Sequence, residues 1–169
     1  LQMQAEIGPF SPMYFSRIAQ LTNKSNQFNL TTRRFTQAEI EAMAGDEHFV
    51  TLYGRLSDKF GDNGVVSVAA GEIKDGTLDI ILWLMSCRVL KRDMEFAMMD
   101  ALAAKCLALG IGRIRGFYFP TARNGMVRDF YAGQGFTRVS GDEAGNTVWE
   151  LDLRRGYENR NHVIETQTI

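Results

Sequence analysis

Three consecutive segments of strand-like composition constrain the fold of this chain more than any other feature of its sequence. They cover about residues 49–56, 65–73 and 78–88, and the dipeptides Asn63-Gly64 and Asp75-Gly76 lie between them. Runs of β-branched and apolar residues bounded by Asn-Gly or Asp-Gly are typical of strands joined by hairpins. The sequence therefore predicts an antiparallel meander. Its first tight hairpin is expected at Asp58 and residues 60–64, with the turn at Asn63-Gly64.

Helical periodicity occurs on both sides of this meander. In residues 11–24, and again in residues 94–109, apolar side chains recur at the spacing that is typical of a helix with one buried face. Thr36 and Glu39 have the spacing of a capping box. We therefore expect a further short helix that begins after Thr36 and ends at Gly45.

The remaining segments complete a mixed fold. They are a strand at 114–119, a short helix at 124–132 and a hairpin of segments 136–139 and 148–153. This order predicts an α/β (α+β) domain with a mixed, mostly antiparallel sheet of about six strands and helices on both faces. We expect this single domain to cover residues 1–153, followed by a polar C-terminal tail at 154–169.

Charge balance and hydropathy argue against several classes of partner. The 169 residues carry 19 Lys and Arg against 20 Asp and Glu, a formal net charge of −1 that matches nucleic acid poorly. The longest apolar run, residues 78–85, is far short of the ~20 residues of a membrane span, and the N-terminus lacks a signal-peptide pattern. We therefore expect a cytoplasmic protein with no nucleic-acid or membrane partner. Cys87 and Cys106 lack metal-ligand spacing, so we expect no metal site.

The segment from Asn124 to Phe136 resembles the "N, spacer, FY, spacer, GF" signature of the GNAT acyltransferases, and the order of the predicted elements matches that fold. The resemblance implies that the thioester of an acyl donor lies beside Asn124 and Tyr131. Asn124 would hydrogen-bond the pantetheine arm, and Tyr131 would be a catalytic residue that protonates the departing thiolate. Helix capping and a turn at Gly135 explain the same pattern without a ligand.

The same resemblance places an acyl-CoA loop of the form R/Q-x-x-G-x-G/A on residues 88–93. Arg88 matches it, but Lys91 and Asp93 occupy two small positions and crowd the approach of backbone N–H groups to a phosphate. We expect the Asp93 side chain to cap the following helix and to take up the donors that a pyrophosphate needs. Arg88, Lys91 and Arg92 are the candidate cofactor-binding residues of this loop, and we expect coenzyme A to bind weakly.

Four blocks of the sequence resemble the C-terminal half of FkbH-like proteins: NKSNQFNLTTRRFT, DKFGDNGVV, LWLMSCRVL and PTARNGMVRDFY. In that family a haloacid-dehalogenase-type phosphatase domain precedes a GNAT-like domain, and the pair places a glyceryl unit on an acyl carrier protein. The resemblance implies two partners, the acyl carrier protein with its phosphopantetheine thioester and an N-terminal phosphatase domain of the same polypeptide. The chain contains no DxDxT-type motif, so we expect no phosphatase activity from it.

The loop at residues 26–34 falls where a GNAT-like fold covers the acceptor side of its cleft. Its polar side chains suit a small hydroxylated or anionic group, since arginine presents a rigid fork of donors. The candidate substrate-binding residues are Asn26, Asn29, Thr31, Thr32 and Arg33. A plain connector between two helices is the alternative.

Cys87 ends the strand that the resemblance aligns with the thioester. We favour a buried and inert thiol, because free cysteine is among the most buried residue types. In the alternative, Cys87 is a catalytic nucleophile that accepts the acyl group beside Arg88. Glu72 and Asp79 are strand carboxylates that could serve as a general base, and the sequence does not decide for either.

Together these observations favour a GNAT-like acyltransferase domain that handles a glyceryl or related acyl thioester on the phosphopantetheine arm of an acyl carrier protein. An acetyl-CoA-dependent N-acetyltransferase is one alternative, which Asn124 and Tyr131 support and which Lys91 and Asp93 oppose. A non-catalytic module that docks the carrier protein or packs on the phosphatase domain is the other.

Overall fold

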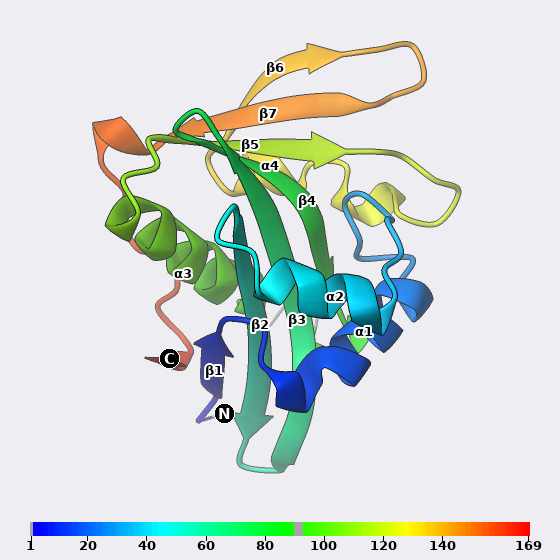
Figure 1. The fold of residues 1–169 in the computed structure, drawn as a ribbon, viewed down its shortest axis with the longest axis vertical. Helices are drawn as coiled ribbons and strands as arrows, with labels where there is room; N and C mark the ends of the chain where they lie inside the picture. The colour runs from blue at the N-terminus through cyan, green and yellow to red at the C-terminus, as the bar shows by residue number, and fades with distance from the viewer. Residues whose placement is uncertain (1, 90–92) are drawn as a thin grey trace.

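One sheet organises the fold (Figure 1). The computed structural model describes residues 2–89 and 93–169 of the chain. In these residues, eight strands pair in the order β6-β7-β5-β4-β3-β2-β1-β8. They are β1 (Gln4–Gly8), β2 (Phe49–Asp58), β3 (Gly61–Lys74), β4 (Thr77–Met85), β5 (Arg113–Tyr118), β6 (Thr137–Gly141), β7 (Thr147–Asp152) and β8 (Glu165–Thr168).

Helices cover both faces of the sheet, as the sequence predicts. They are α1 (Phe15–Lys24), α2 (Gln37–Ala44), α3 (Met94–Ala108) and α4 (Phe130–Gly133), with short 3-10 turns η1 (Pro12–Tyr14), η2 (Cys87–Val89), η3 (Gly125–Val127) and η4 (Leu153–Arg155). Leu82 of β4 packs with α1 and α2 on one face, and the next residue, Trp83, packs with α3 on the other. This alternation is the two-residue period of a strand buried on both sides. No helix within the described residues is long and apolar enough to cross a membrane.

The predicted cap of α2 and the predicted turn at Asp75-Gly76 both form. Thr36 and Glu39 make both hydrogen bonds of the capping box, at 3.1 and 2.9 Å, and Gly45 ends α2. Asp75 and Gly76 have φ angles of 51° and 76°, which a two-residue hairpin turn between β3 and β4 requires. The meander β2-β3-β4 is antiparallel throughout, as predicted.

The first hairpin, however, turns at a different place from the one predicted. Asp58 pairs with Gly61, so residues 59–60 form its tip. Gly64 lies inside β3 with a φ of 70°, beside a shift of register between β2 and β3. The tight hairpin predicted at Asp58 and residues 60–64 therefore forms, but the placement of its turn at Asn63-Gly64 is wrong, because the left-handed backbone of Gly64 forms a bulge within β3.

Two strands near the chain ends raise the sheet from the predicted six strands to eight. β8 pairs in parallel with β1 at the edge of the sheet, and all its residues are exposed. Asp100 of α3 holds the segment before β8, because its carboxylate accepts hydrogen bonds from the Tyr157 hydroxyl at 2.6 Å and from the Asn161 N–H at 2.9 Å. Part of the region predicted as a polar tail therefore belongs to the sheet.

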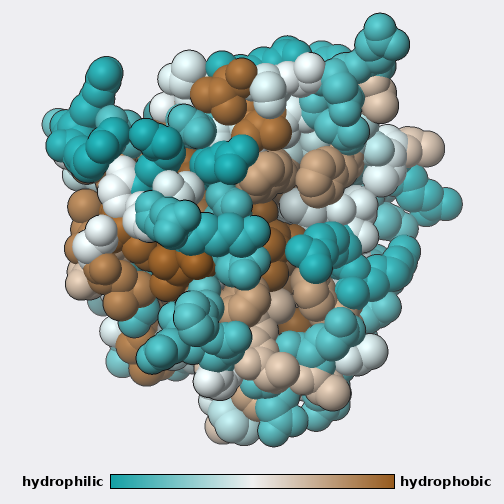
Figure 2. Space-filling model, turned by 45° about the horizontal axis from the view of Figure 1, so that its top comes forward, coloured by the Kyte–Doolittle hydropathy of each residue, from teal (hydrophilic) through white to brown (hydrophobic). Residues whose placement is uncertain are grey.

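Cross-strand ion pairs surround the first residues of β4. Asp79 lies 4.0 Å from Lys74 and 3.8 Å from Arg115, and Arg115 also reaches Glu150 of β7 at 3.6 Å. Glu72 pairs with Lys74 at 3.5 Å. On the face shown in Figure 2, hydrophilic side chains lie between the hydrophobic areas. Both strand carboxylates considered for a general base, Glu72 and Asp79, therefore belong to a network of charges.

The parallel strands β4 and β5 pair only where they begin. Thr77, Leu78 and Asp79 are the paired residues of β4. Beyond them, the structure describes no pairing between β4 and β5, and the two strands diverge (Figure 1). An opening therefore separates residues 80–85 of β4 from the end of β5.

Candidate functional site

The opening between β4 and β5 is filled by the chain itself, at residues 28–30 of the loop between α1 and α2. The Leu30 N–H donates to the Trp83 carbonyl at 3.0 Å, and the Met85 N–H donates to the Phe28 carbonyl at 3.0 Å. On the other side, the Phe119 N–H just after β5 donates to the Leu30 carbonyl at 2.9 Å. We call residues 28–30 the wedge, because they bond to both diverging strands.

Asn124 fastens the wedge to the loop after β5. Its side chain is fully buried, and its Nδ2 donates to the carbonyls of Asn29 and Phe119, both at 3.0 Å. Its Oδ1 accepts from the Thr121 N–H at 2.8 Å and from the Tyr118 hydroxyl at 3.3 Å. Both amide hydrogens are thus used within the protein. The predicted bond from Asn124 to a pantetheine arm stays a prediction, and it requires one of these bonds to break.

Tyr131 lies in the core rather than on a surface. Its ring packs on Gly116 of β5, where an added Cβ would lie 2.4 Å from the ring. Its hydroxyl donates to the Phe117 carbonyl at 3.3 Å, and burial raises the pKa of this phenol. A raised pKa makes the phenol a weaker acid. The proton-donor role of Tyr131 stays a prediction, and it requires the hydroxyl to come into contact with the thioester.

Aromatic rings close the opening on the side of α4. Phe130 packs edge-on against Phe28 of the wedge and against Trp83 of β4, with ring centroids 5.4 and 4.9 Å apart. The Trp83 indole is fully buried, and its N–H has no acceptor among the described residues. Together the rings and the wedge occupy the space between the two strands.

A hollow of about 400 Å³ lies where β4 ends, and we call it the β4-end pocket. It is lined by α1, by the loop that leads into the wedge, and by residues 85–88. Arg17, Lys24 and Arg88 bring three positive charges to it, and none of the described residues that line it is acidic. Its other polar side chains are Ser25, Asn26, Gln27, Ser86 and Cys87.

Cys87 is exposed in this pocket, so the favoured interpretation of a buried thiol is wrong. The reason is that β4 ends at Met85 and the following 3-10 turn places Cys87 outside the sheet. The thiol donates to Oε1 of Gln27 at 3.1 Å. Exposure is what an acyl-accepting nucleophile needs, and that role of Cys87 stays a prediction.

The structure separates the five predicted substrate-binding residues. Asn26 lines the β4-end pocket. Asn29 and Thr31 are buried and donate to backbone carbonyls at 3.0 and 2.9 Å, which holds the loop in place. Thr32 turns the chain with a φ of 52°, and Arg33 lies over a phenyl ring in a different hollow beside α2. Of these five residues, Asn26 alone is described as lining the pocket.

Asp93 does not form the predicted side-chain cap of α3. It occupies the N-cap position, but its carboxylate accepts no hydrogen bond from the first turn. Its φ of 64° is left-handed, whereas a capping side chain needs an extended backbone. The prediction is therefore wrong, and the Asp93 side chain does not take up the donors of α3. Arg88 lines the β4-end pocket, whereas Lys91 and Arg92 lie outside the described residues.

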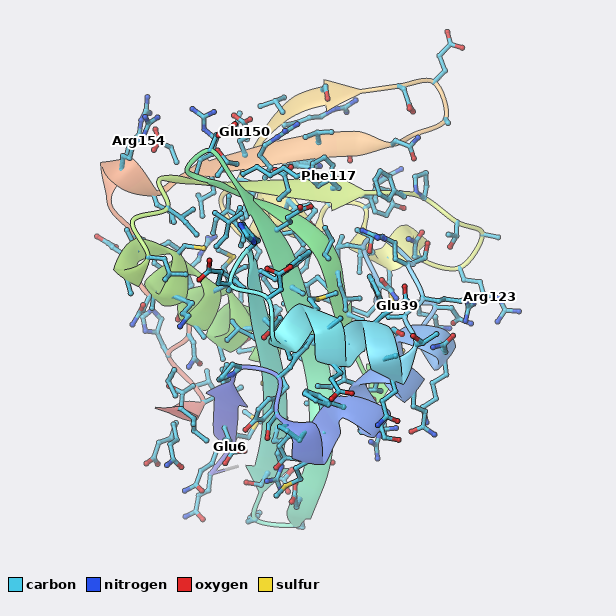
Figure 3. All side chains as sticks on the ribbon, viewed as in Figure 1. Glu6, Glu39, Phe117, Arg123, Glu150 and Arg154 are labelled. Carbon is cyan, nitrogen blue, oxygen red and sulfur yellow. The ribbon has the colours of Figure 1, made fainter. Side chains whose placement is uncertain are left out.

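The two candidate general bases lie away from this pocket. Asp79 is the third residue of β4, and at ~3.3 Å per residue it lies about 20 Å along the strand from Met85. Glu72 pairs with Asp79 in the neighbouring strand. In Figure 3, Glu150, which shares Arg115 with Asp79, lies near the top of the molecule, and Glu6 lies well below it beside β1.

Arg17 and Lys24 are pocket residues that the sequence reasoning missed. They lie seven positions apart, with Leu21 between them, so one face of α1 carries all three. A pair of cations at this spacing on an amphipathic helix is the signal that would have found them.

Replacing Asn124 by alanine should destabilise the fold strongly. The change removes two donors and one acceptor that bind the wedge to the loop after β5, and it leaves buried polar groups without partners. We expect the free energy of unfolding to fall by about 2–4 kcal/mol in urea denaturation. Asn159→Ala, at an exposed position, is the control and should change it by less than about 0.5 kcal/mol. Equal stabilities of the two variants would show that Asn124 does not hold the wedge.

Replacing Asp93 by glycine should stabilise the protein. Glycine adopts a φ near 64° without steric strain, and no side-chain cap is lost. We expect the free energy of unfolding to rise by about 0.5–1 kcal/mol. Asp93→Ala keeps the strained Cβ and should not show this gain. A glycine variant less stable than the parent protein would mean that the carboxylate does cap α3.

No protein-family model and no curated protein sequence matches the chain. Solved structures do resemble it. The ribosomal-protein-S18-alanine N-acetyltransferase of Escherichia coli superposes with a TM-score of 0.66 at 10% identity, over 94% of this chain and 100% of that one. A GNAT-family acetyltransferase of Streptococcus pneumoniae gives 0.68 at 13% identity, over 88% and 99% of the two chains.

A third similar structure contains a ligand. The PaiA N-acetyltransferase of Thermoplasma acidophilum, solved in complex with coenzyme A, gives a TM-score of 0.63 at 12% identity, over 88% of this chain and 99% of that one. Identities this low establish the fold alone. The chain has the α+β fold of the GNAT acetyltransferases.

Proposed function

We propose that the chain is an acyltransferase domain that takes an acyl group from the thioester of a phosphopantetheine arm. The observation that carries the proposal is the β4-end pocket, which holds an exposed thiol at the end of β4. The resemblance to GNAT acyltransferases aligns this strand with the thioester. The fold supports the same chemistry, since one similar structure was solved with coenzyme A, which contains a phosphopantetheine arm.

The wedge limits how such an arm approaches β4. The carbonyl of Trp83 and the N–H of Met85 already bond to the wedge, so they are not free to pair with a ligand. Phe28 and Met85 line the β4-end pocket and form its inner wall. We therefore place the thioester at the open end of β4, beside Cys87.

Cys87 is the proposed acceptor of the acyl group. In this step its sulfur attacks the thioester carbonyl, and a new bond forms between Sγ and the acyl carbon. The carbon–sulfur bond of the donor breaks, and the donor leaves as a thiol with the proton that Cys87 gives up. The product is a thioester on Cys87, from which a second acceptor removes the acyl group.

Two sources provide this type of thioester. The FkbH-like blocks of the sequence support an acyl carrier protein that bears a glyceryl or related acyl group. Coenzyme A is the second source, supported by the fold and by the similar structure that was solved in complex with it. An acetyl-CoA-dependent N-acetyltransferase is therefore the second candidate function.

Calorimetric titration separates these candidates. The three ligands are acetyl-CoA, a phosphopantetheinylated acyl carrier protein, and the same carrier protein without its arm. We expect an arm-bearing ligand to bind at least about tenfold more tightly than the carrier protein without its arm, because the thioester end enters the β4-end pocket. Binding of acetyl-CoA alone would select the second candidate. Equal binding of both carrier forms, with no binding of acetyl-CoA, would contradict the proposal and indicate a docking module.

Mass spectrometry of the protein after incubation with the bound donor tests the acceptor. We expect the peptide that contains Cys87 to gain the mass of the acyl group, and Cys87→Ala to lose this product. The Cys106 peptide is an internal control, because that thiol is buried and burial raises its pKa to about 12. Full transfer to the final acceptor by Cys87→Ala would exclude Cys87 from the reaction.

A further inference from the structure

We propose that the β4-end pocket binds a phosphate monoester. This inference rests on the proposed function, because it names a group carried by a small substrate that occupies the same site as the thioester end of the arm. Arg17, Lys24 and Arg88 line the pocket, together with two amide and two hydroxyl side chains. Its described lining contains no carboxylate. Such a set of donors suits a doubly charged anion.

The cations of this pocket lack the partners that other arginines of the chain have. Arg55 lies 3.6 Å from Glu6 and also pairs with Asp62, and Arg115 lies within 4 Å of both Asp79 and Glu150. In the described part of the chain, no ion pair joins Arg17, Lys24 or Arg88 to a carboxylate. Three positive charges are therefore gathered without a counter-charge from the described residues.

Arg17 and Arg88 are close enough to repel each other. Burial lowers the pKa of Arg17, and the charge of Arg88 lowers it further. Like charges at short range cost free energy unless an anion lies between them. A bound phosphate would remove this repulsion. Phosphate binding therefore explains why Arg17 and Arg88 lie close together, which folding alone does not favour.

Within the described residues, the guanidinium groups of Arg17 and Arg88 also keep free donors. Arg17 donates to Gln20 at 2.9 Å, and Arg88 lies 3.4 Å from the Ser86 hydroxyl and 3.5 Å from the Asn63 carbonyl. Each guanidinium has five N–H groups, so these bonds leave several for a ligand. The neighbouring groups hold both side chains beside the pocket without neutralising them.

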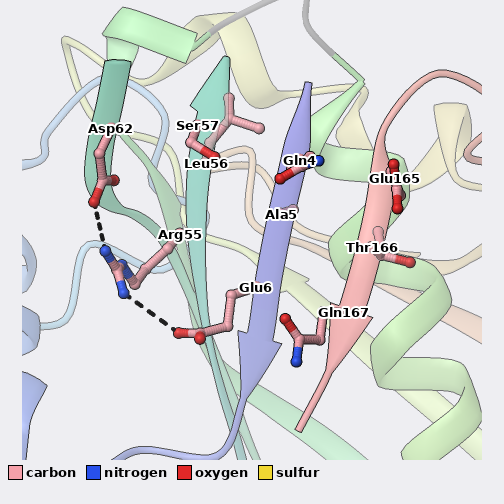
Figure 4. Close-up of a pocket in the computed structure, with 10 residues that line it drawn as sticks. All are labelled: Gln4, Ala5, Glu6, Arg55, Leu56, Ser57, Asp62, Glu165, Thr166 and Gln167. Atoms are coloured by element: carbon pink, nitrogen blue, oxygen red, sulfur yellow. Dashed lines mark hydrogen bonds and ion pairs between the residues drawn. The ribbon is translucent and has the colours of Figure 1, made fainter. Parts of the chain in front are cut away.

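A second hollow of similar size shows the opposite arrangement (Figure 4). It has a volume of about 400 Å³ and lies over β1, β2 and β8. Arg55 is the only basic side chain among its described lining residues, and it points between Asp62 and Glu6. Glu165 adds another carboxylate. This hollow would therefore repel a phosphate. Of the two pockets, the β4-end pocket is the one whose described lining has basic side chains and no carboxylate.

Binding of three small probes tests the inference: glycerol 3-phosphate, glycerol and inorganic phosphate. We expect glycerol 3-phosphate to bind at least about tenfold more tightly than glycerol, and inorganic phosphate to compete with it. The double variant Arg17→Gln, Arg88→Gln should lose this difference. Lys105→Gln, at an exposed position of α3, should keep it. The melting temperature of the double variant should equal or exceed that of the parent protein, because no ion pair is lost.

The probes also distinguish the source of the phosphate. Binding of inorganic phosphate that the double variant loses, without a gain for glycerol 3-phosphate over glycerol, would support the pocket and assign it to a phosphorylated substrate with a different carbon skeleton. Equal binding of glycerol and glycerol 3-phosphate, with no binding of inorganic phosphate, would overturn the inference. Phosphate affinity that the double variant retains would overturn it as well.

Failure of this inference can be told apart from failure of the proposed function. Acyl transfer from an S-acyl pantetheine, which carries no phosphate, measures the function by itself. Transfer by a protein that shows no phosphate affinity would refute the phosphate pocket and leave the acyltransferase proposal standing. Phosphate binding by a protein that transfers no acyl group from any thioester would refute the acyltransferase proposal and leave the phosphate pocket standing.

Discussion

The backbone hydrogen bonds between the wedge and β4 are the interaction on which the rest of the site depends. β4 and β5 part after Asp79, so the second half of β4 would otherwise present unpaired groups to an opening. A buried backbone group without a partner costs about 1–3 kcal/mol. The wedge satisfies the carbonyl of Trp83 and the N–H of Met85, and it thereby fixes the course of the loop between α1 and α2.

The wedge fills the opening between β4 and β5. The part of β4 that a ligand can reach is therefore its end, at the β4-end pocket. Phe28 is at once a wedge residue, a contact of Phe130 and a wall of the β4-end pocket. Asn124 holds the arrangement from the side of β5. Asn124 and Tyr131, the residues that resemble a thioester site, thus make structural contacts in this chain. The exposed thiol and the three cations line the β4-end pocket instead.

The sequence was sufficient where a structure depends on neighbouring residues. The capping box at Thr36 and the turn at Asp75-Gly76 need only groups within a few positions, and both form. It was insufficient where distant contacts decide. β8 has no apolar alternation, and its place follows from its pairing with β1 and from the hold of Asp100 on the preceding segment.

The candidate site shows the same limit. Cys87 looked buried because it follows an apolar strand, but the strand ends two residues earlier. Asp93 has the residue type of a cap, but its left-handed backbone prevents the bond. Which of the loop residues line the pocket depends on the path of the wedge. This path follows from the divergence of β4 and β5, which lie about fifty and about eighty-five residues later in the chain.

Amide hydrogen exchange at Leu30 and Met85 tests the central claim most directly. Both N–H groups donate in the bonds that join the wedge to β4. If the thioester binds at the end of β4 while the wedge stays in place, both amides should remain as protected in the protein saturated with a phosphopantetheine thioester as in the free protein. Loss of protection at Leu30, with Met85 still protected, would contradict the account, because it would show that the ligand had replaced the wedge along β4.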